Sequence, residues 1–178
     1  SSAKSYNLKD NKTGETPAVE TSFKAGWDKN ALLLEITCKE PHMDKLPVSP
    51  QVHGGDYVAI SLETTKHSYY HIEVNPDGAI VEGMPASKWK SLADVKTERG
   101  ADFWRLRLSI PVVGDEDAAA DPNHKVHGDK PTAKNPWYFN VGRYRKLDEK
   151  NAELQAFSPT KRTLHQPKMF GRLEINAH

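Results

Sequence analysis

The sequence predicts an all-β protein, an antiparallel β-sandwich of the immunoglobulin-like or jelly-roll type with long loops and little helix. Three observations predict this fold class. Apolar and polar residues alternate along several short segments, turn signals separate those segments, and no stretch longer than about two turns has a helical period. Short strands at regular intervals, without helices between them, are typical of a sandwich in which each strand buries one face.

The expected strands follow one another along the chain. In the segment 31–39, Leu32, Leu34, Ile36 and Cys38 fall on one face and the intervening residues on the other. The same alternation occurs at 57–63, 69–74 and 103–110, and further strands are expected at 137–145, around 155–157 and at 171–176. One face of each strand should therefore be buried and the other wet. Cys38 faces inward in this pattern, which is the usual place of an inert thiol.

Turn-forming residues mark the connections. The segments 27–30 and 99–102 each form a short turn, and 75–78 reads Asn-Pro-Asp-Gly. That run is a strong turn signal, because Pro presets one φ angle and Gly accepts a positive one. Two long stretches, 41–55 and 114–136, break the alternation. Long loops in a compact domain are commonly functional, so we expect site residues in both.

Length and composition fit one domain over 1–178. The chain has 178 residues, of which 37% are hydrophobic and 28% charged, and its formal net charge is +1. This near-neutral balance argues against nucleic-acid binding through bulk charge. No apolar run approaches the roughly 20 residues of a membrane span. The chain starts without Met or an apolar signal core, so we expect a secreted, periplasmic or cell-surface protein whose signal peptide has been removed, with a monomer favoured.

The sequence carries few signs of catalysis. It lacks a Gly-rich phosphate loop, a Gly-x-Ser-x-Gly elbow and a His-Glu-x-x-His helix. Its single cysteine cannot form an intrachain disulfide and is expected to be buried. We therefore expect a binding protein rather than an enzyme.

The order of motifs resembles the family 9 carbohydrate-binding modules and their wider relatives. The matching segments are 55–60 (GDYVAI), 69–78 (YYHIEVNPDG), 104–111 (WRLRLSIP), 137–143 (WYFNVGR), 157–159 (FSP) and 165–171 (HQPKMFG). The resemblance covers about 23–175 and implies a non-catalytic ligand-binding module. Sugar-binding members resemble a clamp, in which two tryptophans sandwich a sugar ring while carboxylate, guanidinium and amide groups bind its hydroxyls.

The sequence departs from that clamp at nearly every position. Where the resemblance implies the two clamp tryptophans, the sequence has His53 and either Leu164 or His165. Where it implies the carboxylate, the guanidinium and the amide, the sequence has Ala59, Glu73 and Gly142. The scaffold is therefore expected to persist without its usual sugar pocket.

These replacements introduce histidines, and imidazole is a good ligand for Cu, Zn and Ni. The predicted metal ligands are His53, His124 and His127, with His165 in reserve; the spacing His124-x-x-His127 lets two imidazoles reach one ion from a single turn. In the same broad fold class, the chain is similar to methanotroph surface copper proteins, where two histidines and an oxidised tryptophan hold Cu(I). Gln51 stands where their tryptophan is expected. Copper, for capture or storage, is the preferred metal.

Alternatives to copper stay open. A carbohydrate-binding module with a rebuilt site, acting with polysaccharide-degrading machinery, would use Trp89, Arg143, Tyr144 and Phe157 for stacking and hydroxyl contacts, with Trp89 expected to be exposed. A haem-binding module is a minor alternative.

A structural calcium ion could accompany any of these functions. Five carboxylates crowd the second long loop, Asp115, Glu116, Asp117, Asp121 and Asp129, although without EF-hand spacing. His71, on the outward face of an expected strand, should be exposed and without a role.

Overall fold

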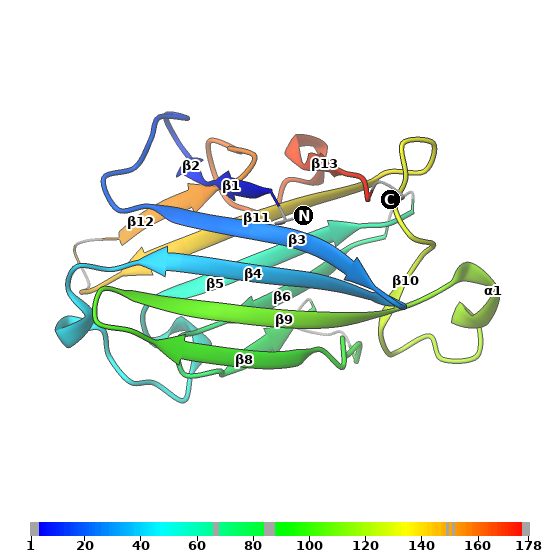
Figure 1. Ribbon diagram of the computed structural model, residues 1–178, viewed down its shortest axis with the longest axis horizontal. Helices are drawn as coiled ribbons and strands as arrows, with labels where there is room; N and C mark the ends of the chain where they lie inside the picture. The colour runs from blue at the N-terminus through cyan, green and yellow to red at the C-terminus, as the bar shows by residue number, and fades with distance from the viewer. Residues whose placement is uncertain (1–3, 66–67, 84–87, 149, 151, 176–178) are drawn as a thin grey trace.

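The computed structural model describes residues 4–65, 68–83, 88–148, 150 and 152–175, and it confirms the antiparallel β-sandwich. Two sheets pack face to face (Figure 1). The first sheet has the strand order β1-β3-β4-β9-β10, and β8 also pairs with β9. Its strands are β1 (Ser5–Asn7), β3 (Thr21–Asp28), β4 (Ala31–Lys39), β8 (Asp94–Arg99), β9 (Phe103–Val113) and β10 (Val126–His127).

The second sheet has the order β2-β12-β11-β5-β6-β7, and β13 also pairs with β11. Its strands are β2 (Lys9–Asp10), β5 (Tyr57–Glu63), β6 (Tyr70–Val74), β7 (Ile80–Glu82), β11 (Trp137–Lys146), β12 (Ala152–Ala156) and β13 (Gly171–Leu173). Helix is scarce, as predicted: the described chain has the single turn α1 (Asp115–Ala118) and the 3-10 turns Met43–Lys45, Val52–Gly54 and Pro167–Met169.

The predicted alternation produces the core. Leu32, Leu34, Ile36 and Cys38 of β4 are all buried, while their neighbours along the strand are only partly covered. The inward residues of β5 and β9 join them in one hydrophobic cluster between the sheets. Cys38 is buried, as expected, and burial raises the pKa of its thiol.

Several strands were not predicted, and all of them are short or polar. β8 is the clearest case, because its sequence DVKTER has one strongly apolar residue and its burial alternates between exposed and intermediate. β8 forms because the 99–102 turn brings it beside β9, which pairs with it along its whole length. The expected strand 171–176 ends at Leu173, and residue 176 lies outside the described residues.

β11 is buried on both faces over most of its length, and so is its neighbour β5. On the outward face of β11, the Asn140 amide nitrogen donates to the Ser158 carbonyl (2.8 Å), and the Ser158 N–H donates back to Asn140 Oδ1 (2.9 Å). Beside them, Leu164 packs so closely over Gly142 that a Cβ there would lie 2.3 Å from Leu164 Cδ1. The segment 158–170 is thereby held against the outside of the second sheet, and it carries His165 with it.

Candidate functional site

The candidate site lies on the outward face of the second sheet, at β6. His71 and Glu73 point away from the core, yet they are only 3% and 8% exposed. The expectation that His71 is exposed is therefore wrong. The outer segment that carries His165 covers this part of the sheet, and the His71 and His165 rings lie with their centroids 4.6 Å apart.

Four side chains, which we call the histidine cluster, meet here: His53, His71, Glu73 and His165. His53 Nε2 lies 2.6 Å from Glu73 Oε2, and His71 Nε2 lies 3.0 Å from Glu73 Oε1. The second contact is short but poorly aligned, so His71 Nε2 is a buried nitrogen without a proper hydrogen bond. Potential ligand atoms of His71, Glu73 and His165 all lie within 4.8 Å of one another.

Hydroxyl groups hydrogen-bond to the Nδ1 atoms of two of these imidazoles, the buried His71 and the exposed His165. Ser61 Oγ on β5 lies 2.9 Å from His71 Nδ1, and Tyr69 Oη lies 2.7 Å from His165 Nδ1. The Tyr69 ring also stacks near-parallel to the His71 ring at 6.0 Å. Both histidines are therefore fixed in orientation.

The surroundings shift two pKa values in the cluster. Burial lowers the pKa of His165, and the neighbouring His71 lowers it further. Burial by itself opposes ionisation of Glu73, but the contacts from His71 and His53 outweigh it and hold the pKa of that carboxyl below its usual range. At neutral pH the cluster therefore contains an ionised carboxylate beside a neutral His165 imidazole.

Two hollows open on this face. A pocket of about 220 Å³ borders the histidine cluster and is also lined by Tyr57, Tyr144 and Arg162. A wider hollow of about 630 Å³, which we call the Tyr138 groove, is lined by Glu63, Ser68, Tyr69, Tyr138, Lys168 and Phe170. Tyr69 lines the groove and contacts His165 of the pocket, so the two hollows adjoin.

The positions implied by the carbohydrate-binding resemblance do come together in space. His53 contacts Glu73, Glu73 pairs across the strands with Ala59, and Ala59 pairs with Gly142. Leu164 packs with Ala59 in a small apolar cluster above the sheet. Because Ala59 and Gly142 are small, Leu164 occupies the space that larger polar side chains would need.

His124 and His127 do not join His53. His127 follows α1 at one end of the sandwich, and the 41–55 loop lies at the other end (Figure 1). The His127 carbonyl accepts a hydrogen bond from Thr64, just after β5, whereas His53 precedes that strand. The seven residues of β5 separate the two by roughly 20 Å. The prediction that His53 shares one copper site with His124 and His127 is therefore wrong.

Both loop histidines have local partners instead. His124 Nδ1 lies 2.7 Å from Asp121 Oδ1, and His127 Nε2 donates toward the carbonyls of Asp121 (3.1 Å) and His124 (3.0 Å). Within the described residues, the clustered carboxylates of this loop form no group of three potential metal ligands. The side chain of Asp115 lies outside the described part. The calcium and haem hypotheses stay predictions.

Two of the proposed sugar-contacting aromatics are packed into the protein. Trp89 is 8% exposed, and its Nε1 donates to the Lys125 carbonyl (2.6 Å), so the expectation of an exposed ring is wrong. Phe157 is partly buried, with its ring edge-on to Phe23 at 5.2 Å and tilted against Phe139 at 5.4 Å. Trp89 therefore cannot offer a face to a sugar without unpacking, and Phe157 packs against two aromatic rings of the core.

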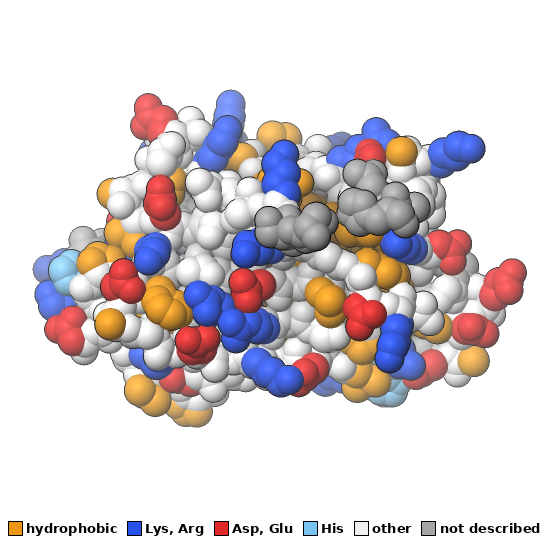
Figure 2. Space-filling model, viewed as in Figure 1, with side chains coloured by type: hydrophobic (Ala, Val, Ile, Leu, Met, Phe, Trp, Pro, Cys, Tyr) orange, Lys and Arg blue, Asp and Glu red, His pale blue; other side chains and the backbone are white. Residues whose placement is uncertain are grey.

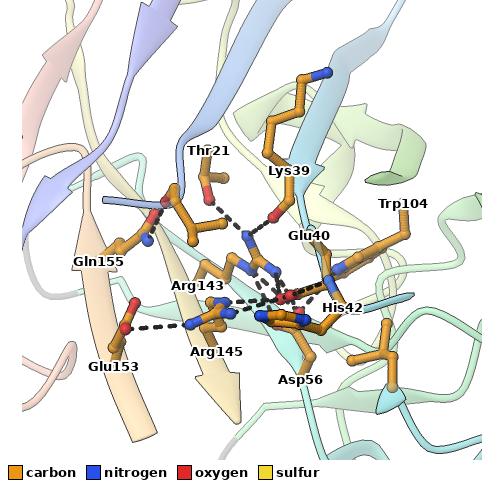
Figure 3. A network of polar contacts seen from close by, with 12 residues as sticks. Thr21, Lys39, Glu40, His42, Asp56, Trp104, Arg143, Arg145, Glu153 and Gln155 are labelled. Carbon is orange, nitrogen blue, oxygen red and sulfur yellow. Dashed lines mark hydrogen bonds and ion pairs between the residues drawn. The ribbon is translucent and has the colours of Figure 1, made fainter. Parts of the chain in front are cut away.

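Arg143 is also unable to bind hydroxyls of a ligand, because it is fully buried in an ion-pair network (Figure 3). Its Nη2 lies 2.5 Å from Asp56 Oδ2 and 3.3 Å from Glu40 Oε2. Arg145 completes the network with a 2.7 Å contact from Nε to Glu40 Oε2. Tyr144, the fourth proposed residue, does line the pocket and stacks on Tyr57 at 5.3 Å.

The outer face of the first sheet is different in character. Figure 2 shows cationic and anionic side chains interspersed over it. Many are paired across strands, as in Arg107 with Glu35 (2.8 Å) and Arg105 with Glu98 (3.3 Å). This face therefore carries paired charges of both signs, whereas the clamp positions lie on the second sheet. No helix of the described chain has the length and apolarity to cross a membrane.

The sandwich has the fold of the family 9 carbohydrate-binding modules. A module of this family from Caldicellulosiruptor kristjanssonii, solved with cellotriose, superposes with a TM-score of 0.69 at 17% identity and covers 99% of this chain and 84% of its own. A structure from the same organism with glucose gives 0.66 at 17% identity, with 97% and 85% covered.

A third solved structure is a Bacteroides uniformis protein provisionally described as carbohydrate-binding. It gives a TM-score of 0.70 at 16% identity, with 98% of this chain and 87% of that chain covered. These neighbours are described as carbohydrate-binding proteins rather than enzymes. No protein-family model matches the chain, and no curated protein matches it significantly.

Proposed function

We propose that this protein is an exported, non-catalytic carbohydrate-binding module that holds a neutral glycan in the Tyr138 groove. The observation that carries the proposal is an exposed aromatic ring in a hollow on the face where the clamp positions gather. Tyr138 is 45% exposed, and its ring is available as a platform for a sugar. The shared fold, and neighbours solved with cellotriose and glucose, support the same ligand class.

The groove also contains the polar chemistry that sugar hydroxyls need. Tyr138 pairs across the strands with Glu63 of β5, which also lines the groove. Directly paired residues project from the same face of a sheet. A planar carboxylate therefore lies beside the aromatic ring, and the Lys168 ammonium also lines the groove, which combines hydroxyl recognition with coverage of the apolar ring face.

The test is titration of cellotriose and a panel of neutral glycans into the protein, with EDTA present, by calorimetry or affinity electrophoresis. We expect micromolar to millimolar binding. Tyr138→Ala should weaken it about tenfold or more, because ring stacking is lost. Val48→Ala, which removes an exposed apolar side chain on the 41–55 loop, is the matched control and should bind normally. Absence of glycan binding at high protein concentration, or indifference to Tyr138→Ala, would refute the proposal.

A further inference from the structure

We propose that the histidine cluster is a binding site for one divalent transition-metal ion, held by His71 Nε2, a carboxylate oxygen of Glu73 and a ring nitrogen of His165. One such atom from each residue lies within 4.8 Å of the others. Ligands at about 2.1 Å from one ion in tetrahedral geometry are about 3.4 Å apart. Side-chain movements of roughly 1 Å would therefore bring all three into one coordination sphere.

The strongest single observation is the state of His71. Its side chain is 4% exposed, and its Nε2 has no well-aligned hydrogen bond although it points at the cluster. Its 3.0 Å contact with Glu73 Oε1 is poorly aligned, and a buried polar nitrogen without a well-made hydrogen bond is costly in folded proteins. Coordination to a metal ion would satisfy it, and the hydroxyl of Ser61 at Nδ1 leaves Nε2 as the ligating atom.

Each proposed ligand is held by a second group, as in established metal sites, where such partners orient the ligands and tune their basicity. Ser61 Oγ holds His71, and Tyr69 Oη holds His165 at 2.7 Å. His53, 59% exposed in its side chain, contacts the far oxygen of Glu73 at 2.6 Å. His53 is thus a positioning residue for the carboxylate rather than a primary ligand.

The donor set selects the class of metal. Two imidazoles and one carboxylate suit Zn²⁺, Cu²⁺ or Ni²⁺, whereas Ca²⁺ and Mg²⁺ prefer a sphere of oxygens. The adjoining pocket of about 220 Å³ gives an ion access from solvent. This site does not use Tyr138, so it stands independently of glycan binding.

The experiment is a Zn²⁺ titration by calorimetry on the full chain after EDTA treatment and dialysis, repeated with Co²⁺ to follow its visible absorption. We expect one saturable ion per chain. His165→Gln and Glu73→Gln should each weaken Zn²⁺ binding about 100-fold or more, and His53→Gln about 10- to 100-fold. Since His165 is exposed, His165→Gln should fold normally, which circular dichroism checks.

The double variant His124→Gln/His127→Gln is the matched control, because it removes two histidines outside the cluster. It should bind Zn²⁺ like the wild-type protein. Failure to bind Zn²⁺ one-to-one, binding unchanged by His165→Gln, or loss of binding in the control would overturn the proposal. Glycan binding is measured in EDTA, so either proposal can fail alone.

Discussion

Replacing Arg143 by Met should strongly destabilise the protein, because it breaks the buried network of Figure 3 from its centre. The Arg143 side chain donates to Asp56 from two nitrogens, at 3.0 Å from Nε to Oδ1 and 2.5 Å from Nη2 to Oδ2. Its Nη1 also donates to the Lys39 carbonyl at 2.7 Å. In the variant, Asp56 would keep Trp104 Nε1 as a donor but no cation.

The expected loss is about 3–5 kcal/mol of unfolding free energy, the usual cost of leaving one buried charge uncompensated. For a chain of this length that corresponds to a melting temperature lower by roughly 6–20 °C. Urea unfolding followed by circular dichroism measures it. Arg107→Met is the control, because Arg107 pairs with Glu35 on the surface, where such pairs often contribute nothing measurable.

The pH dependence distinguishes an unpaired charge from simple loss of packing. Burial already raises the pKa of Asp56 against the opposing charge of Arg143, and removing Arg143 should raise it further. A carboxyl whose pKa is raised in the folded state contributes most to the free energy of unfolding below the pKa it has in the unfolded chain, about 4. That contribution is lost as the pH rises. The deficit of Arg143→Met should therefore shrink between pH 7 and about pH 4.

Arg143→Met/Asp56→Asn removes the stranded charge and should recover part of the stability at pH 7. A deficit below about 1 kcal/mol in Arg143→Met, or one independent of both pH and Asp56→Asn, would refute this account of the network.

Three further predictions follow from the same packing. Gly142→Ala should cost about 1–3 kcal/mol in urea unfolding, because its Cβ would lie 2.3 Å from Leu164 Cδ1 and 3.1 Å from the Gln155 carbonyl; an unchanged midpoint would mean that Leu164 is not locked in place. The buried Cys38 thiol should react with Ellman's reagent only as the protein unfolds, and rapid labelling of the native protein would contradict this. His165 has a lowered folded-state pKa, so its contribution to stability is present above about pH 6.5 and lost as pH falls through that pKa; His165→Gln should flatten this part of the stability profile.

Local sequence determined much of the scaffold. Alternation with period two depends only on the directions of successive side chains, so β4, β5, β6, β9 and β11 could be placed from the residues alone. Short strands such as β1 and β8 have too few apolar residues for a pattern, and they form because a neighbouring strand offers hydrogen bonds. The sequence also singled out His53 and His165 as replacements on the clamp face.

Tertiary structure decided which of the candidate residues meet. The period-two pattern places His71 on the outward face of its strand and so predicted an exposed side chain. The segment 158–170, far away in sequence, folds over β6 and buries it. Arg143 and Trp89 were assigned to a surface because their types suit sugar binding, whereas buried carboxylates and a backbone carbonyl hold them inside. Burial and partnership depend on which distant segments pack together, and a local pattern carries no information about that packing.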